Sequence, residues 1–310
     1  MHRSIQSLGG SLTALVTPFR DTQLDLPALA RLAARQIDHG TDGLVVCGST
    51  GEAQSLSTGE FAQAVAAVVA AARGRVPVIA GCTSPSTAAT MALSEQAARA
   101  GADGLLCAVP PYVKPTQDGI VAHIRAVAHA ADLPIVIYDV PSRSGTAIAD
   151  ATIARLFAAE LIVGVKDATA DLSRPPRLHA LCGEGLVQFS GDDATTAGYR
   201  AMGGDGCISV TANVTPALCA QLHRAWDQGD RRSFAAVRDL LHPLHAALFA
   251  ESNPIPVKAA MDQLGLCGSD VRLPLTRATP ATQERLLHLL ESIITAEQHA
   301  AMRPPYALAS

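Results

Sequence analysis

Short runs of consecutive apolar residues recur along the chain, bounded by glycine, proline or polar residues. Several are rich in valine, isoleucine and leucine, as parallel strands covered on both faces are. We predict eight such strands, at Leu12–Val16, Gly43–Val46, Val76–Ala80, Gly104–Ala108, Pro134–Tyr138, Ile162–Lys166, Leu186–Ser190 and Gly206–Val210.

Longer segments separate these runs, and in them apolar residues recur every three or four positions, as on one face of an amphipathic helix. The pattern predicts helices near Leu26–Asp38, Gly59–Ala72, Thr87–Ala100, Gln117–Ala130, Asp150–Ala158, Arg174–Leu181, Ala194–Met202 and Thr215–Gln228. Eight strand-and-helix units predict a closed (β/α)8 TIM barrel of the α/β class. The alternative is an open doubly wound sheet, but no G-x-G-x-x-G follows the first strand, as a dinucleotide site there would need.

Three further helical stretches follow the eighth unit, near Arg231–Ala250, Ile255–Gly265 and Ala281–Glu297. We expect them to pack on the barrel as a C-terminal helical extension. Such barrels commonly reach about 250 residues as one domain. The 310 residues are therefore predicted to divide into a catalytic barrel at 1–228 and an extension at 229–310.

Composition narrows the classes of function. Hydrophobic residues make up 48% and charged residues 17% of the chain, with a net charge of −4, so no basic patch for nucleic acid is expected. No apolar run reaches the roughly 20 residues of a membrane span. The seven cysteines form no C-x-x-C pair and are expected to be buried free thiols. Residues Met1–Gly10 resemble no targeting segment, so a cytoplasmic location is expected.

Lys166 ends the sixth predicted strand, where side chains of a barrel reach the active face. Only three of the 24 basic residues are lysine, so this chain uses arginine for ordinary positive charge. An amine can form an imine whereas a guanidinium cannot, and an apolar strand end favours the uncharged, nucleophilic amine. The alternative interpretation is a lysine that reaches from the strand end to water. Lys114, in a proline-flanked loop, and Lys258, just inside a helix, are expected to be solvated.

Three other candidates lie at the same end of the predicted barrel. Tyr138 ends the fifth strand, beside Lys166, and a phenol there can move protons. Arg143 lies in the following loop, where its fork of donors suits a carboxylate. Gly48–Glu52, with Ser49 and Thr50, follows the second strand, and its backbone N–H groups could bind a second carboxylate. Each has an ordinary structural alternative: a tyrosine at a barrel rim, an exposed arginine and a glycine-rich turn.

No metal site is predicted. His242 and His245 lie three residues apart in a predicted helix, but Pro243 intervenes and a third ligand is missing. The single tryptophan, Trp226, is expected to pack against its neighbours.

Taken together, these segments resemble the dihydrodipicolinate synthase and N-acetylneuraminate lyase family, from about Gly10 to the last helix. The resemblance rests on six motifs in order. They are G-S-T-G-E at 48–52, Y-D-V-P-S-R-S-G at 138–145, V-G-V-K-D at 163–167, S-G-D-D at 190–193, G-C-I-S-V-T-A-N at 206–213 and N-P-I-P-V-K at 253–258.

The resemblance implies a pyruvate-dependent class I lyase. Lys166 would form a Schiff base with pyruvate, and Tyr138 with Ser49 would relay protons. The backbone of Ser49 and Thr50 would hold the pyruvate carboxylate, while Gly191 and the carbonyl of Ile208 would line the site. The resemblance also implies small-molecule substrates, a homotetramer, and no metal or organic cofactor, because the protonated imine is itself the electron sink.

Two alternatives within the family remain open. The arginine of the Y-D-V-P-S-R-S-G motif favours the branch that condenses pyruvate with aspartate semialdehyde to 4-hydroxy-tetrahydrodipicolinate. Synthases usually carry a second tyrosine after Pro110-Pro111-Tyr112, contributed across a subunit interface, but Val113 stands there. Either water or Tyr112 substitutes, or the chain is a sister aldolase or dehydratase acting on a keto-deoxy sugar acid or 4-hydroxy-2-oxoglutarate.

Two further expectations concern ligands. A non-catalytic ligand-binding paralogue is the third alternative, and an intact Lys166 and Tyr138 argue against it. Family members inhibited by lysine bind it with histidine, asparagine and glutamate side chains. In this chain the aligned positions carry side chains that cannot bind lysine in the same way, namely Thr58, Phe61, Pro85 and Ala89. We therefore expect little inhibition by lysine.

Overall fold

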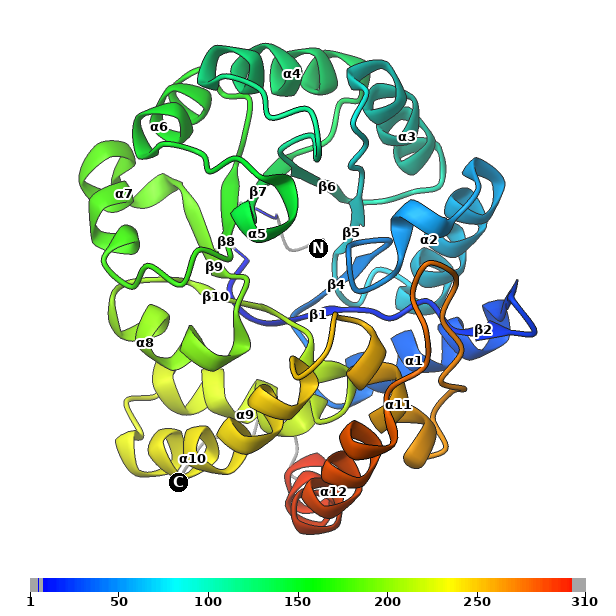
Figure 1. Cartoon of the computed structure of the whole chain (residues 1–310). Coiled ribbons are helices and arrows are strands. Elements are labelled where there is room, and N and C mark those ends of the chain that lie inside the picture. The colour runs from blue at the N-terminus through cyan, green and yellow to red at the C-terminus, as the bar shows by residue number, and fades with distance from the viewer. Residues whose placement is uncertain (1–4, 6–7, 303–310) are drawn as a thin grey trace.

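A closed barrel of eight parallel strands forms the centre of the molecule (Figure 1), as predicted. The computed structural model describes residue 5 and residues 8–302. Neighbouring strands follow the order of the chain, and the first pairs with the last. The strands are β1 (Gly10–Ala14), β4 (Gly43–Val46), β5 (Val78–Gly81), β6 (Gly104–Ala108), β7 (Ile135–Asp139), β8 (Gly164–Asp167), β9 (Val187–Ser190) and β10 (Gly206–Ser209).

An outer ring of helices covers the barrel (Figure 1), and its helices agree with the predicted segments to within a few residues. They are α1 (Leu26–Asp38), α2 (Thr58–Ala72), α3 (Thr87–Arg99), α4 (Gln117–Ala130), α6 (Asp150–Ala158), α7 (Arg174–Cys182), α8 (Thr196–Ala201) and α9 (Pro216–Asp227). Local sequence explains several helix starts. Ser57 and Glu60 form a reciprocal capping box at α2, and proline occupies the first turn of α7 and α9.

Several predicted boundaries differ from the observed ones by a few residues, the most at the end of α12 (Pro280–Ala301), which was predicted to end at Glu297. β1 begins at Gly10, two residues before the predicted start, because pairing with β10 extends to Gly10. The first residues of the predicted helix Ala194–Met202 form a 3-10 turn at Asp193–Thr195. A two-stranded hairpin, β2 (Phe19–Arg20) and β3 (Gln23–Leu24), and the one-turn helix α5 (Pro141–Ser144) were not predicted, since neither is long enough to show a period.

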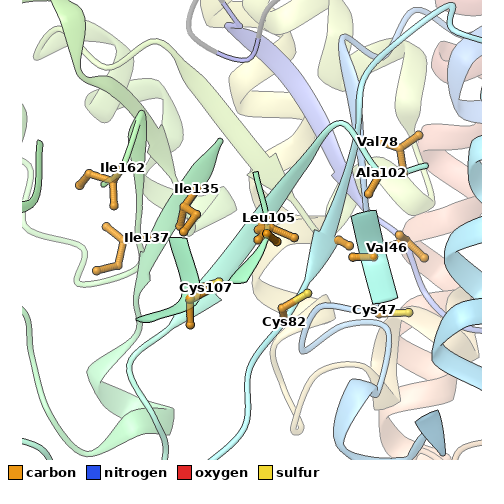
Figure 2. Packing of buried hydrophobic residues seen from close by; sticks show 14 of the residues in the cluster. Val46, Cys47, Val78, Cys82, Ala102, Leu105, Cys107, Ile135, Ile137 and Ile162 are labelled. Atoms are coloured by element: carbon orange, nitrogen blue, oxygen red, sulfur yellow. The ribbon is translucent and has the colours of Figure 1, made fainter. Parts of the chain in front are cut away.

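Side chains alternate between two apolar layers along each strand. One layer lies between the strands and the helices and includes Ile137 (Figure 2) and also Val165. The other fills the barrel interior and includes Val136 and Tyr138. Because Val165 faces the helices, the next residue, Lys166, faces the interior. This alternation is what brings Lys166 to the mouth of the barrel.

The cysteines are free, as predicted, and most are buried. Cys47, Cys82 and Cys107 lie in the layer between strands and helices (Figure 2). Burial raises the pKa of Cys82 to about 12. Their thiols therefore act as small apolar side chains.

Three long helices follow the barrel: α10 (Arg231–Leu248), α11 (Ile255–Gln263) and α12 (Pro280–Ala301). A separate apolar cluster joins them to α9 and to Leu32 of α1, so they pack on the side where the barrel closes (Figure 1). The predicted division at residues 228 and 229 falls at the turn between α9 and α10 and stays a prediction.

Within residues 8–302, no helix is long and apolar enough to cross a membrane. The prediction made for Met1–Gly10 falls largely on residues 1–4 and 6–7, which lie outside the described residues.

Candidate active site

A cavity of about 440 Å³ opens at the carboxyl ends of the barrel strands. Six of the seven predicted site residues line it: Ser49, Thr50, Tyr138, Arg143, Lys166 and Gly191. The seventh, Ile208, is buried in the barrel interior beneath, while Val210, two residues further on, reaches the cavity. Residues separated by more than 100 positions in the sequence thus meet at one site.

Lys166 and Tyr138 occupy matching positions on neighbouring strands. They are register partners in the β7–β8 pairing, and the Lys166 Nζ lies 4.4 Å from the centroid of the Tyr138 ring. Both side chains are more than nine-tenths buried, with 6% and 8% of their surfaces exposed. Lys166 is therefore held inside the mouth of the barrel, and the alternative of a lysine reaching to water does not describe it.

Gly191 follows β9 and leaves room for the lysine. A Cβ atom at this position would lie 3.1 Å from the Lys166 Cε and 3.0 Å from the Ala168 Cβ, both tighter than ordinary contacts. The Gly191 N–H donates to the carbonyl of Asp167, 2.6 Å away, which fixes this turn against the end of β8. A side chain here would therefore press on both Lys166 and Ala168.

The G-S-T-G-E loop turns sharply after β4. The N–H groups of Gly51 and Glu52 donate to the carbonyls of Gly48 and Ser49, and Glu52 adopts a left-handed φ of 51°. Within the described chain, the N–H groups of Ser49 and Thr50 donate to no protein acceptor. Two adjacent free donors at the cavity wall suit a carboxylate.

Arg143 lies on α5, and its Nη2 donates to the carbonyl of Asn253, 3.0 Å away. The side chain of Asn253 in turn donates from Nδ2 to the Thr50 Oγ1 over 2.9 Å. Asn253, from the C-terminal extension, thus contacts both Arg143 and the G-S-T-G-E loop, the two predicted carboxylate-binding elements. Sequence reasoning did not single out Asn253 as a site residue, although it begins the N-P-I-P-V-K motif.

The prediction for Lys258 was wrong. Its side chain is fully buried, and Nζ forms an ion pair with Glu52 and donates to the carbonyl of Asp270 over 2.8 Å. It also lies 4.2 Å from the centroid of the Phe19 ring. The other Glu52 oxygen accepts from the N–H of Arg272 over 3.0 Å. A helix start that looks solvated in sequence is covered here by segments distant along the chain.

A second cavity, of about 250 Å³, adjoins the first and shares Ser49, Tyr138 and Arg143 as lining residues. Pro111, in the Pro110–Pro115 loop, also lines it. Tyr112 has a left-handed φ of 74° and is 92% exposed, while Val113 is 53% exposed. A bulky residue with positive φ is strained, and such strain clusters at functional sites.

The other candidates are the histidine pair and the tryptophan, of which His242 is exposed. No group of metal-ligating side chains was found among the described residues. His245 is buried, and its Nδ1 lies 2.8 Å from the Thr211 Oγ1. The Trp226 ring packs against Phe234 at a centroid distance of 5.1 Å, as expected for a packing residue.

Comparison with known proteins agrees with the motifs. The model of the Dihydrodipicolinate synthetase family matches residues 7–293. A protein from Rhodospirillum centenum named 4-hydroxy-tetrahydrodipicolinate synthase is 50% identical over 275 residues, which cover 89% of this chain and 94% of that protein. A protein of the same name from Rhizobium meliloti is 48% identical, covering 89% of this chain and 95% of its own.

Solved structures give the same result. Dihydrodipicolinate synthase from Aquifex aeolicus superposes with a TM-score of 0.90 at 39% identity, covering 92% of this chain and 98% of that one. The 4-hydroxy-tetrahydrodipicolinate synthase from Methylacidiphilum fumariolicum superposes with a TM-score of 0.91 at 34% identity, covering 94% and 99%. The resemblance seen in the motifs is confirmed, and this chain belongs to the dihydrodipicolinate synthetase family.

Proposed function

We propose that this chain is a pyruvate-dependent class I lyase that acts as a 4-hydroxy-tetrahydrodipicolinate synthase. The observation that carries the proposal is the buried amine of Lys166 beside the Tyr138 ring, in a cavity that also offers Arg143. The names of the relatives, at up to 50% identity, support the same activity.

The proposed chemistry begins with attack of the Lys166 amine on the keto carbon of pyruvate. The new C–N bond gives a carbinolamine, and loss of its hydroxyl as water gives a protonated imine. Tyr138, with Ser49, supplies and removes the protons of these steps. The imine then accepts the electron pair when a methyl proton leaves. The resulting enamine attacks the aldehyde of aspartate semialdehyde, which forms the new C–C bond and regenerates the imine. The amino group of the aldehyde substrate then adds to the imine carbon, and cleavage of the Lys166 C–N bond closes the ring and returns the free amine.

The two carboxylates of the substrates have separate proposed partners. The N–H groups of Ser49 and Thr50 hold the carboxylate of pyruvate near Lys166. Arg143, fixed by its bond to the Asn253 carbonyl, receives the carboxylate of the aldehyde. Gly191 and the Ile208 carbonyl form the wall and floor beside the imine. The proposal needs no metal and no organic cofactor, because the protonated imine accepts the electron pair of the broken C–H bond.

We propose that a second copy of the chain completes the proton relay with Tyr112. The second cavity leaves a space beside Ser49 and Tyr138, and Tyr112 extends outward from its own chain with 92% of its surface exposed. The family resemblance implies a tyrosine delivered across a subunit interface, within a homotetramer. The free thiols fit a reducing cytoplasm.

The sister aldolase or dehydratase remains the second candidate, and Val113 is the observation in its favour. An acceptor panel assayed with pyruvate separates the two candidates. The proposal predicts turnover with aspartate semialdehyde well above that with sugar-derived aldehydes. It also predicts that the gene restores growth of a diaminopimelate auxotroph. Soluble protein that fails both assays, yet cleaves or dehydrates a 2-keto acid, would establish the sister reaction.

A further inference from the structure

Two aspartates lie behind the proposed catalytic pair, on the helix side of the barrel. Asp139 follows Tyr138 at the end of β7, and Asp167 follows Lys166 at the end of β8; the two are register partners. Because side chains alternate along a strand, they point away from the cavity that Tyr138 and Lys166 face. Both are buried, with exposed fractions of 0% and 2%.

One guanidinium joins the two strand ends from behind. Arg174, the first residue of α7, is 3% exposed, and its Nη1 lies 2.6 Å from the Asp139 Oδ2 and 3.3 Å from the Asp167 Oδ1. Its Nη2 donates to the Ile148 carbonyl over 2.6 Å, and its Nε to Asp150 over 2.9 Å. The guanidinium is therefore fixed on every edge.

The position of Arg174 among three aspartates requires both a positive charge and several hydrogen-bond donors. Three carboxylates surround one cation, and burial raises the pKa of Asp139 while its bond to Arg174 opposes that shift. Removing the cation would leave buried carboxylates without a counter-ion. A lysine would keep the charge, but its single ammonium lacks the planar fork that reaches several acceptors at once.

We propose that Arg174 is a positioning residue for imine formation, because it holds the ends of β7 and β8 so that Tyr138 stays beside Lys166. This inference rests on the proposed function. Arg174 does not line the cavity, so it acts only through the two strands. Proton transfer between Tyr138 and the carbinolamine depends steeply on their separation, whereas the pyruvate carboxylate is held by a different loop.

The test measures the rate of imine formation at saturating pyruvate, by quenching with borohydride, in Arg174→Lys and Arg174→Met. We expect imine formation to slow about 10-fold in the lysine variant and about 100-fold in the methionine variant. The pyruvate concentration that gives half the maximal rate should change by less than about threefold. Arg174→Lys keeps the buried charge, so it tests the proposal even if Arg174→Met does not fold.

Arg177→Met is the matched control. Arg177 lies one turn further along α7 and also binds Asp150, but it is 45% exposed and does not contact Asp139 or Asp167. We expect its imine formation to match that of the wild type.

A double variant separates positioning from stability. Arg174→Met with Asp139→Asn removes charges of both signs, so the free energy of unfolding should recover relative to Arg174→Met. Imine formation should remain slow. Recovery of the rate together with stability, or a wild-type rate in Arg174→Lys, would overturn the inference while leaving the proposed function intact. Wild-type protein that forms no imine with pyruvate would overturn both.

Discussion

Lys166 and Tyr138 form a pair because parallel strands place residues in register at the same height of the barrel. Gly191 lies at the next strand end, where a Cβ would approach the lysine side chain more closely than an ordinary contact. The proposed attack of the amine on the keto carbon therefore depends on the placement of these few side chains.

Gly191→Ala tests that steric condition. The new methyl group would lie 3.1 Å from the Lys166 Cε, so we expect the lysine to shift and kcat/KM for pyruvate to fall about 10-fold or more. Gly59→Ala is the control, because a Cβ there meets nothing within 4 Å. Equal kcat/KM values for Gly191→Ala and the wild type would show that Gly191 does not shape the site.

Some of the buried polar residues could be predicted from the sequence, and others could not. Lys166 could be predicted because lysine is scarce and this one ends an apolar strand. Lys258 could not, because its burial depends on Glu52, Asp270 and Phe19, which meet it only in the folded chain. The contact between Asn253 and the G-S-T-G-E loop could not be predicted for the same reason, because Asn253 and Thr50 are 203 positions apart in the sequence.

The element that holds the G-S-T-G-E loop is α11. Glu52 keeps its left-handed backbone while its carboxylate binds Lys258 on α11 and the N–H of Arg272. The C-terminal extension thus contacts the loop to which we assign carboxylate binding, as well as packing on the barrel.

Lys258→Met removes the cation from this buried pair. We expect a loss of about 3–5 kcal/mol in the free energy of unfolding, because Glu52 is left buried without a partner. The pyruvate KM should rise as the loop loosens. Lys258→Met with Glu52→Gln should recover much of the stability, and Lys114→Met at an exposed position is the control for stability. Unchanged stability in Lys258→Met would contradict the assigned role of the pair.

Long elements were predictable because eight periodic strand-and-helix units leave few folds to choose from. Short elements were not. The β2–β3 hairpin has two residues in each strand, and α5 has one turn. Arg272 donates to the Thr22 carbonyl in the hairpin turn, and Arg143 joins α5 to Asn253, so both elements have tertiary contacts that a local pattern does not show.

For the whole molecule, the proposed role of Tyr112 in the proton relay predicts sites that are shared between two copies of the chain. If each site takes Lys166 from one copy and Tyr112 from another, Tyr112→Phe and Lys166→Arg should each be nearly inactive alone. Mixing them under conditions of subunit exchange should restore about a quarter of the sites in a dimeric unit. A mixture with no more activity than its components would show that Tyr112 does not act across an interface.

Buried histidines should make the folded chain sensitive to acid. Desolvation lowers the pKa of His223 to about 3, whereas an unfolded chain titrates near pH 6.5. Between these values the unfolded chain binds a proton that the folded chain does not, so stability falls as the pH drops below about 6.5. When the pH is lowered from about 7.5 to about 5.5, the free energy of unfolding should decrease less in His223→Leu than in the wild type, at equal protein concentration. Parallel losses in both proteins would rule out His223 as the source.

Mass spectrometry after borohydride reduction in the presence of pyruvate detects the proposed imine between pyruvate and Lys166. We expect the reduced pyruvate adduct on the peptide that contains Lys166, and none in Lys166→Arg. An unmodified Lys166 peptide, or an adduct on Lys114 or Lys258 instead, would contradict the proposal.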